Sequence, residues 1–408
     1  MSGVPRMFAL GPLEGLRVLD LTQMLAGPIC SMRMGDLGAD VLKIEPPGDG
    51  EWTRTHGFAN AEVGGHTTAQ LGLNRNKRSV ALNLKDVAAL EVFYDLVRHA
   101  DVLVQNYRVG TAERLGIGFE RLAALNPRLV YCSISGYGET GPYKDRPGQD
   151  LIVQGYSGSM FSVGAADDPP MPGALWAVDT MTGYQALIGI LAALRVREQT
   201  GAGQKIMVNM LAVAMDCQAQ ELVTAFNLGI QPKRSDKPFA HAWVTAPYGS
   251  YRTKDGWLNI SQVPLDKLGD ALEEPRLQVM TAWSDGMTRR DEVYEILTEV
   301  IPAKTTAEWL EILDEHKLWG GPVYTYGDLE RDPHVQATAM ITSIEHADIG
   351  TLKMPNIPMQ FSETPGQVRL PPPRLGEHTV EVLREILGLD ETKLNDLRSS
   401  GGIQDGAR

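Results

Sequence analysis

Residues 17–45 read RVLDLTQMLAGPICSMRMGDLGADVLKIE, and the fold class follows from this segment. Its first six residues form a short apolar run suited to a buried strand, and Pro28 stands where a helix can begin. Gly38 can end that helix, and residues 39–45 have the composition of a second buried strand. The segment therefore predicts a strand, a helix and a second strand in succession.

The same alternation continues downstream. Apolar runs predict strands at residues 79–85, 101–107 and 128–135, and helical spacing predicts helices at residues 88–100 and 118–127. Strands that alternate with helices favour a mostly parallel sheet covered by helices on both faces. We therefore expect an α/β fold with a Rossmann-like large domain.

The second half of the chain has a different pattern of predicted helices and strands. A long helix is predicted after Asp179, and Gly201 can close it. Residues 248–261 then read as a hairpin, and amphipathic helices follow at 291–301 and 307–316. This change predicts a smaller α+β domain.

The expected domain limits follow from these patterns. The large domain takes residues 1–225, the small domain residues 226–335, and the chain returns to the large domain at residues 336–408. Residues 371–389 predict a capped helix after a proline run. The final segment SSGGIQDGAR, residues 399–408, is expected to be frayed.

Composition narrows the classes of function. The 408 residues carry 38 Lys and Arg against 51 Asp and Glu, a net charge of −13 that repels phosphate backbones, so nucleic acid is not an expected partner. Three widely spaced cysteines indicate a reducing compartment. We see no secretion signal and no apolar run of about 18 residues, so we expect a cytoplasmic protein with no membrane span. The histidines show no metal-ligand spacing, and no metal site is expected.

One glycine motif invites a nucleotide-binding interpretation. Residues 136–141 match G-x-G-x-x-G directly after a predicted strand. A dinucleotide fingerprint must open a helix, whereas here Pro142 follows at once and Pro147 comes soon after. We therefore interpret this segment as a loop.

Two aspartates have the positions that carboxylate chemistry requires. Asp179 precedes the long helix and Asp150 precedes a shorter one, so each can cap a helix or serve a site. Helix-terminal amides keep a carboxylate ionised and can steady an oxyanion on the carbonyl that it attacks. Position alone leaves both interpretations open, with capping the more common.

Basic residues cluster near two of the predicted strands. The first cluster is Arg75, Lys77 and Arg78, and the second is Arg108 and Arg114. A solvated surface is the ordinary explanation for any one of them. Together they would also suit an anionic ligand lying across the strand ends, where open α/β sheets bind their ligands.

Several ordered segments together resemble the family III CoA-transferases, the group that contains formyl-CoA transferase. The segments are LTQMLAGP, GDLGADVLKIEPPGDGEWTR, NRNKRSVALNLK, VQNYRVGTAERLGIGFERLAALNPRLVYCSISGYGETGPYKDRPGQDLIVQGYSG, VDTMTGYQALIGILAALRVREQTGAGQ and PPRLGEHTVEVLREILG. The resemblance is strong over residues 13–210 and 370–390 and weak over residues 230–340.

The resemblance implies CoA-ester chemistry with Asp179 as the nucleophile. The carboxylate would attack a donor thioester and form an aspartyl mixed anhydride and free CoA thiolate. No ATP is required, because one thioester is exchanged for another, but water must be excluded. Coenzyme A and its acyl thioesters are then substrates, with no tightly bound cofactor. The resemblance also implies an interlocked homodimer.

The resemblance further implies roles for individual residues. Those that match positions along a CoA channel are Met24, Leu25, Ala26, Leu82, Asn106, Tyr107, Arg108 and Arg114. Gln149 and Asp150 match a pair beside the catalytic carboxylate. Leu25 stands where formyl-CoA transferase has a glutamine, so formate and oxalate are not the expected acids. We expect transfer of CoA between carboxylic acids, with a small di- or hydroxy-acid such as succinate on one side.

Three other functions stay open at this point. An α-methylacyl-CoA racemase of the same fold needs a histidine where this chain has Gln149, which cannot carry a proton, although His241 could serve from the second domain. A CoA-binding protein without turnover is the non-enzyme alternative. A nicotinamide dehydrogenase is the most distant.

Overall fold

The computed structural model describes residues 11–406, and the chain divides into two compact units. The large unit comprises residues up to 153, residues 176–213 and residues from 334 onward. The small unit comprises residues 154–175 and 214–333. The expected small domain, residues 226–335, thus covers only part of the small unit, which also includes two segments nearer the N-terminus.

A seven-stranded sheet forms the centre of the large unit, in the order β14-β5-β2-β1-β6-β7-β8. All neighbouring strands are parallel except β14, which pairs antiparallel with β5. The strands are β1 (Arg17–Asp20), β2 (Asp40–Glu45), β5 (Lys77–Leu82), β6 (Val102–Gln105), β7 (Val130–Ser135), β8 (Lys205–Asn209) and β14 (Ile403–Gln404). The predicted α/β class with a mostly parallel sheet is therefore confirmed.

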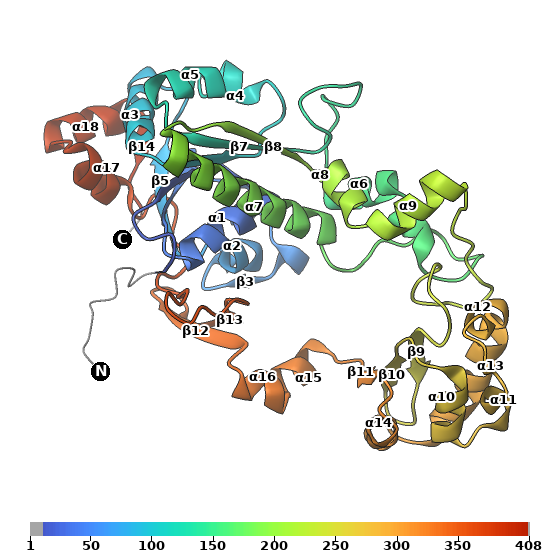
Figure 1. Cartoon of the computed structure of the whole chain (residues 1–408). Coiled ribbons are helices and arrows are strands. Elements are labelled where there is room, and N and C mark those ends of the chain that lie inside the picture. Colours follow the sequence, from blue (N-terminus) through green and yellow to red (C-terminus); the bar gives the residue numbers. More distant parts are fainter. Residues whose placement is uncertain (1–10, 407–408) are drawn as a thin grey trace. The chain divides into compact units, whose positions relative to one another are not determined.

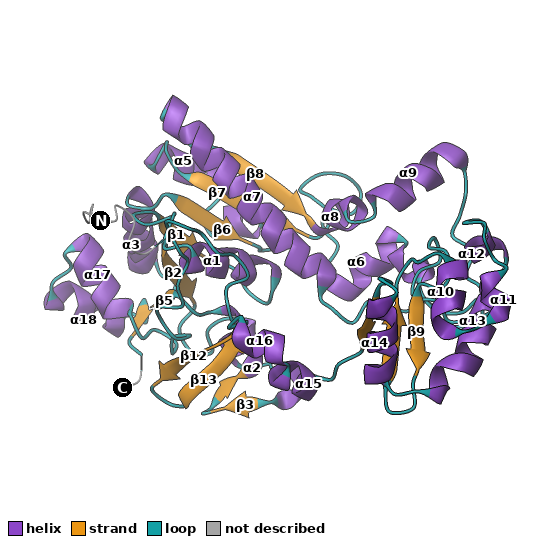
Figure 2. Ribbon diagram, turned by 60° about the horizontal axis from the view of Figure 1, so that its bottom comes forward, coloured by secondary structure: helices purple, strands orange, loops and turns teal. Residues whose placement is uncertain are grey.

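Helices cover both faces of this sheet, as Figures 1 and 2 show. One face packs against α1 (Ala26–Asp36) and α7 (Ala177–Thr200). The other packs against α3 (Val87–Arg98), α5 (Phe119–Leu125), α17 (Thr379–Leu387) and α18 (Glu391–Ser399). Successive strand residues face opposite layers, so Val18 belongs to the first core and Leu19 to the second. Apolar layers thus cover both faces of the sheet, and most residues of its inner strands are buried.

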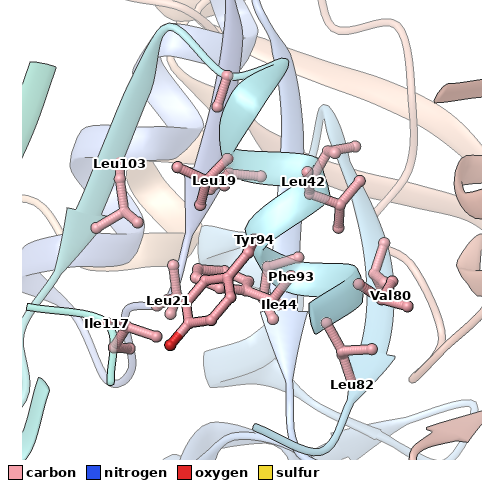
Figure 3. Close-up of a cluster of buried hydrophobic side chains, with 14 of the residues drawn as sticks. Leu19, Leu21, Leu42, Ile44, Val80, Leu82, Phe93, Tyr94, Leu103 and Ile117 are labelled. Atoms are coloured by element: carbon pink, nitrogen blue, oxygen red, sulfur yellow. The ribbon is translucent and has the colours of Figure 1, made fainter. Parts of the chain in front are cut away.

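The core beneath α3 is a dense apolar layer. Figure 3 shows Leu19, Leu42 and Val80, from three neighbouring strands, around Phe93 and Tyr94 of α3. Phe93 is fully buried, and the Tyr94 hydroxyl donates to the carbonyl of Gly116 at 2.9 Å.

The small unit has its own core between a three-stranded sheet and several helices. Its sheet order is β11-β10-β9, and Leu258 and Trp309 lie at the centre of the core. The elements are α9 (Ala219–Leu228), β9 (Gly249–Arg252), β10 (Trp257–Ile260), α10 (Leu265–Leu272), α11 (Pro275–Gln278), α12 (Asp285–Thr288), α13 (Arg290–Val300), α14 (Thr306–Glu315) and β11 (Gly320–Pro322). The predicted hairpin and amphipathic helices lie here.

Shorter elements complete the chain. They are β3 (Glu62–Val63), β4 (His66–Thr67), α2 (Thr68–Leu73), α4 (Thr111–Arg114), α6 (Asp150–Ser157), α8 (Met210–Asp216), α15 (Tyr326–Arg331), α16 (Pro333–Ala337), β12 (Ile341–His346) and β13 (Gly350–Pro355), with short 3-10 turns at Trp52–Arg54, Phe58–Asn60, Ser159–Ser162 and Ile301–Ala303. The last two strands form an antiparallel hairpin in the large unit.

The prediction of a frayed C-terminal segment is wrong for the described residues of that segment. Ile403 pairs with Leu82 and Gln404 with Ala81, so β14 forms an edge of the large sheet. The side-chain oxygen of Gln404 also accepts the backbone N–H of Gly48 at 2.7 Å. Residues 407 and 408, like residues 1–10, lie outside the described part of the chain.

Helix α7 is long and apolar enough to cross a membrane, by length and composition only. In the large unit its buried residues pack against α1 and the neighbouring strands, with Ala186 and Ile190 fully buried. The core helix of a soluble protein passes the same test of length and composition, so the test by itself is weak evidence for a membrane span.

Candidate active site

A cavity of about 470 Å³ opens at the carboxyl ends of the parallel strands of the large unit. Its walls come from the loop after β1, the loop after β6, the loop after β7 and the first turn of α7. The lining includes Gln23, Met24, Leu25, Ala26, Trp52, Asn106, Tyr107, Arg108, Arg114, Lys144, Arg146, Gln149 and Asp179. Open α/β sheets bind ligands at this edge, because the loops after the strands converge there.

Asp179 lies in the first turn of α7 and lines this cavity. The helix begins at Ala177 with Trp176 at the N-cap and no side-chain capping bond, so the capping interpretation of Asp179 is wrong. Burial and the neighbouring carboxylate of Asp150 raise the pKa of Asp179 to about 7. Near neutral pH, Asp179 is therefore present in both ionised and protonated forms.

Asp150 holds the backbone next to Asp179. It is the first residue of α6, is 3% exposed, and its Oδ2 accepts the backbone N–H of Asp179 at 3.0 Å. Just before Asp150, Gly136 and Gly148 approach each other closely, since a Cβ on Gly136 would lie 2.7 Å from the Cα of Gly148. The glycine motif is thus part of a loop, as predicted, and the next helix begins only at Asp150.

The loop after β1 forms part of the wall of the cavity that Asp179 lines. Met24 has a φ of +66°, a left-handed conformation that is uncommon for a residue other than glycine. The side-chain amide of Asn106 both accepts the Gln23 N–H at 2.9 Å and donates to the Gln23 carbonyl at 2.8 Å. The loop is therefore held by side chains from other parts of the sheet edge.

A second cavity of about 190 Å³ adjoins the first, because Gln23, Trp52 and Tyr107 line both. Its remaining walls include Leu82 and Lys85 at the end of β5. Burial and the carboxylate of Asp20 raise the pKa of Tyr107 to about 12, so its phenol stays neutral. The two cavities together offer a continuous lining from the sheet edge to Asp179.

The predicted site residues are distributed over these two cavities. The first is lined by Met24, Leu25, Ala26, Asn106, Tyr107, Arg108, Arg114, Gln149 and Asp179, and the second by Leu82 and Tyr107. Asp150 lines neither and contacts the backbone of Asp179 instead. The sequence analysis missed Trp52, Lys144 and Arg146, for which neither spacing nor periodicity gave a signal.

The suggested anion-binding role of the first basic cluster is wrong. Arg75 pairs with Asp36, Lys77 is fully buried against Asp20, and Arg78 binds Asp40, Glu381 and Glu385. Carboxylates of the same unit therefore use these cations internally. Arg108 and Arg114 of the second cluster do line the cavity.

One group of side chains has the spacing of a metal site. The ligand atoms of His66, His346 and Asp348 lie within 4.8 Å of one another. Both oxygens of Asp348 already bind Arg374, and one also contacts His66 at 2.8 Å. His346 contacts the carbonyl of Pro372 at 3.1 Å through Nε2. These ligand atoms are therefore engaged within the protein.

Comparison with known proteins agrees with this geometry. The model of CoA-transferase family III matches residues 13–379. The chain is 40% identical to the succinyl-CoA–L-malate CoA-transferase beta subunit of Chloroflexus aurantiacus, over 95% of this chain and 97% of the relative. It is 33% identical to the human succinyl-CoA:glutarate CoA-transferase, over 96% and 90%.

Solved structures give the same result. A CAIB/BAIF family protein from Brucella suis is 30% identical and superposes with a TM-score of 0.81, over 92% of this chain and all of that one. The relatives are enzymes that move CoA between an acyl-CoA and a carboxylic acid, with the thioester as substrate. On sequence and structure alike, this chain belongs to CoA-transferase family III and is an enzyme that transfers CoA from an acyl-CoA thioester to a carboxylic acid.

Proposed function

We propose that Asp179 is the nucleophile of the CoA transfer. The observation that carries this proposal is its position, a partly buried carboxylate in the first turn of α7, lining a cavity at the edge of the sheet where ligands bind. A pKa of about 7 leaves enough carboxylate for attack at neutral pH. The first-turn amides of α7 favour negative charge at the same place.

The reaction proceeds in four balanced steps. An Asp179 oxygen attacks the carbonyl carbon of the donor thioester, the C–S bond breaks, and CoA departs as a thiolate. A mixed anhydride between Asp179 and the donor acid remains. The thiolate attacks the Asp179 carbonyl carbon, which releases the donor acid and forms an aspartyl–CoA thioester. The acceptor carboxylate attacks that thioester and expels the thiolate again. The thiolate then attacks the acceptor carbonyl of the new anhydride, which gives the product thioester and frees Asp179.

The two adjoining cavities suit the long CoA molecule. We place the nucleotide end near Leu82 in the second cavity and the thioester at Asp179 in the first. Tyr107 and Trp52, which line both, would flank the pantetheine arm between them. Lys85 lines the second cavity, and Arg108 and Arg114 line the first, so positive charge is available to the phosphates along this path.

The acid is a small dicarboxylate or hydroxydicarboxylate in this proposal. The relatives above are named for succinyl-CoA with L-malate and for succinyl-CoA with glutarate. In this chain Lys144 and Arg146 line the cavity that contains Asp179, and they can neutralise a second carboxylate.

Transfer is favoured over racemisation by the residue that precedes Asp150. Gln149 lines the cavity at the position where a racemase would need a proton carrier. The other histidine considered, His241, lies in the small unit, 3.6 Å from a carboxylate oxygen of Glu221.

Chemical trapping tests the nucleophile. The protein is incubated with succinyl-CoA, treated with hydroxylamine and digested, and the peptides are weighed by mass spectrometry. We expect a hydroxamate on Asp179 and none in Asp179→Asn, while the control Asp95→Asn, on the surface of α3, is labelled like the wild type. Labelling that persists in Asp179→Asn would refute the assignment, and a protein that only binds CoA would show no label at all.

We also propose that two copies of the chain associate, as an interlocked homodimer. An apolar stripe on α7 is exposed in the single chain, with Met181 at 38%, Ile188 at 58% and Leu191 at 37%. Such a stripe on a long helix is typical of a covered interface. Sedimentation of Ile188→Glu should show loss of the dimer, whereas Val87→Glu, a change at an even more exposed position on α3, should not.

A further inference from the structure

The loop after β1 brings Met24 and Leu25 to the cavity that Asp179 also lines, and the conformation of Met24 is not one that its own residue type favours. Met24 has a φ of +66° although it is not a glycine. Non-glycine residues keep such conformations only where the surroundings enforce them. The contacts that enforce this one come from outside the loop.

Glu51 supplies the contact to Met24 itself. Its side chain is 7% exposed, and Oε2 accepts the backbone N–H of Met24 at 3.3 Å and that of Thr53 at 3.1 Å. The Thr53 hydroxyl donates to the other carboxylate oxygen, and the Glu51 N–H donates to Glu45 at 3.3 Å. Glu51 is therefore fixed in place, so it can restrain the loop.

Lys43 supplies the contact to the residue before the loop turns. Its side chain is fully buried on β2, and Nζ donates to the carbonyl of Thr22 at 2.9 Å. Burial alone would lower the pKa of Lys43, but the carboxylates of Asp20, Glu51 and Glu45 outweigh it and raise that pKa. The ammonium group therefore stays charged and keeps its bond to the loop.

The far end of the loop contacts the helix of the nucleophile. Gly183 lies one turn after Asp179, and a Cβ on it would come 2.5 Å from the carbonyl oxygen of Ala26. Helices α1 and α7 thus pack closely at this point, where Gly183 faces the Ile29 side chain and the Ala26 carbonyl of α1. A change in the backbone at Met24 would therefore move Leu25 and Ala26 relative to Asp179.

We propose that Glu51, supported by Lys43, is a positioning residue for CoA transfer. It holds Met24 in the left-handed turn and so sets the distance between the Met24–Ala26 wall and the reacting carboxylate. This inference rests on the proposed role of Asp179 as the nucleophile. Neither Glu51 nor Lys43 is a nucleophile or a proton carrier in this scheme.

The test is a double-mutant cycle on the first chemical step. The rate of Asp179 acylation by succinyl-CoA is measured in a single turnover for wild type, Glu51→Ala, Met24→Gly and the double variant. Glycine adopts a positive φ without strain, so it needs no restraint at position 24. In the protein that retains Met24, we expect Glu51→Ala to slow acylation about tenfold or more. In the Met24→Gly background, we expect the same change to slow it less than about threefold.

Asp36→Asn is the matched control for a purely structural effect. Asp36 is the last residue of α1, is fully buried, and accepts from Arg33, Arg75 and Asn76, at the end of the helix away from the loop. Its loss should lower the unfolding midpoint without changing the acylation rate of the folded protein.

Equal slowing by Glu51→Ala in both backgrounds would overturn the inference. So would an acylation rate that Asp36→Asn lowers as much as Glu51→Ala does. If the wild type forms no label on Asp179, the nucleophile assignment fails instead. The same cycle then applies to the steady-state transfer rate, where the absence of coupling between positions 51 and 24 would overturn the role of Glu51.

Discussion

Replacing the proposed nucleophile should make the protein more stable, by an amount that depends on pH. An aspartate in an unfolded chain ionises near 3.8, whereas burial and Asp150 raise the pKa of Asp179 to about 7 in the folded protein. Between these two pH values the folded state binds more protons than the unfolded state. The contribution of Asp179 to the free energy of unfolding therefore falls as the pH rises through that window. Above the window, the whole destabilisation caused by the buried carboxylate is present.

The magnitude follows from the shift. A difference of roughly three pKa units corresponds to at most about 4 kcal/mol of unfolding free energy, at about 1.4 kcal/mol per unit. Asp179→Asn removes the charge and keeps the size of the side chain. Among the described residues, the Asp179 carboxylate makes no hydrogen bond that the change would break. We expect the variant and the wild type to have the same free energy of unfolding near pH 4. The free energy of unfolding of the variant should then exceed that of the wild type increasingly up to about pH 7.

Urea unfolding of both proteins at several pH values between about 4 and 9 measures this gap, the difference in unfolding free energy between the variant and the wild type. Asp95→Asn on the surface of α3 is the control and should show no gap that grows with pH. A gap that is constant with pH, or an asparagine variant that is less stable than the wild type at about pH 8, would refute the reasoning. The same variant should have lost CoA transfer, so stability and activity would change in opposite directions.

Three further changes have definite expected outcomes. Asp150→Asn keeps an oxygen for the backbone N–H of Asp179 but removes the like charge, so the acidic limb of the transfer rate should move to lower pH; a limb that stays or rises contradicts this. Gly183→Ala forces a Cβ against α1 and should cost about 1–3 kcal/mol of unfolding free energy, whereas Gly72→Ala, with open space around it, should cost nothing. Trp309→Ala empties the centre of the small-unit core and should cost about 3–5 kcal/mol in urea unfolding, and a loss below about 1 kcal/mol would show that the core is not packed around it.

The strands that the sequence predicted best are those buried on both faces. Residues 39–45 and 128–135 each contain a short run of apolar residues, and both segments form interior strands of the sheet. Strand β8 was not predicted, because its residues are only half-buried and one, Met207, is 63% exposed. The two residues of β14 carry no periodic signal, and their pairing with β5 depends on contacts distant in sequence.

Individual residues of the site could be predicted from the sequence, but the hydrogen bonds and ion pairs between them could not. Motif resemblance pointed to Asp179, but the bond from its backbone to Asp150 joins two segments distant in sequence, which no local pattern encodes. Lys77 looked like a ligand for anions in sequence, and only the fold reveals that a buried aspartate neutralises it. Glu51 gave no signal, because its role is to hold the backbone of another segment.

The antiparallel strand β14 has a consequence for how the large unit is made. Its partner β5 is synthesised early, and the outer edge of β5 stays open until the ribosome has added the small unit and the segments after it. Open strand edges are templates for pairing with other chains. The nascent protein must therefore remain protected from aggregation for most of its translation, and tags or deletions at residues 403–404 should reduce the yield of soluble protein before they affect the chemistry.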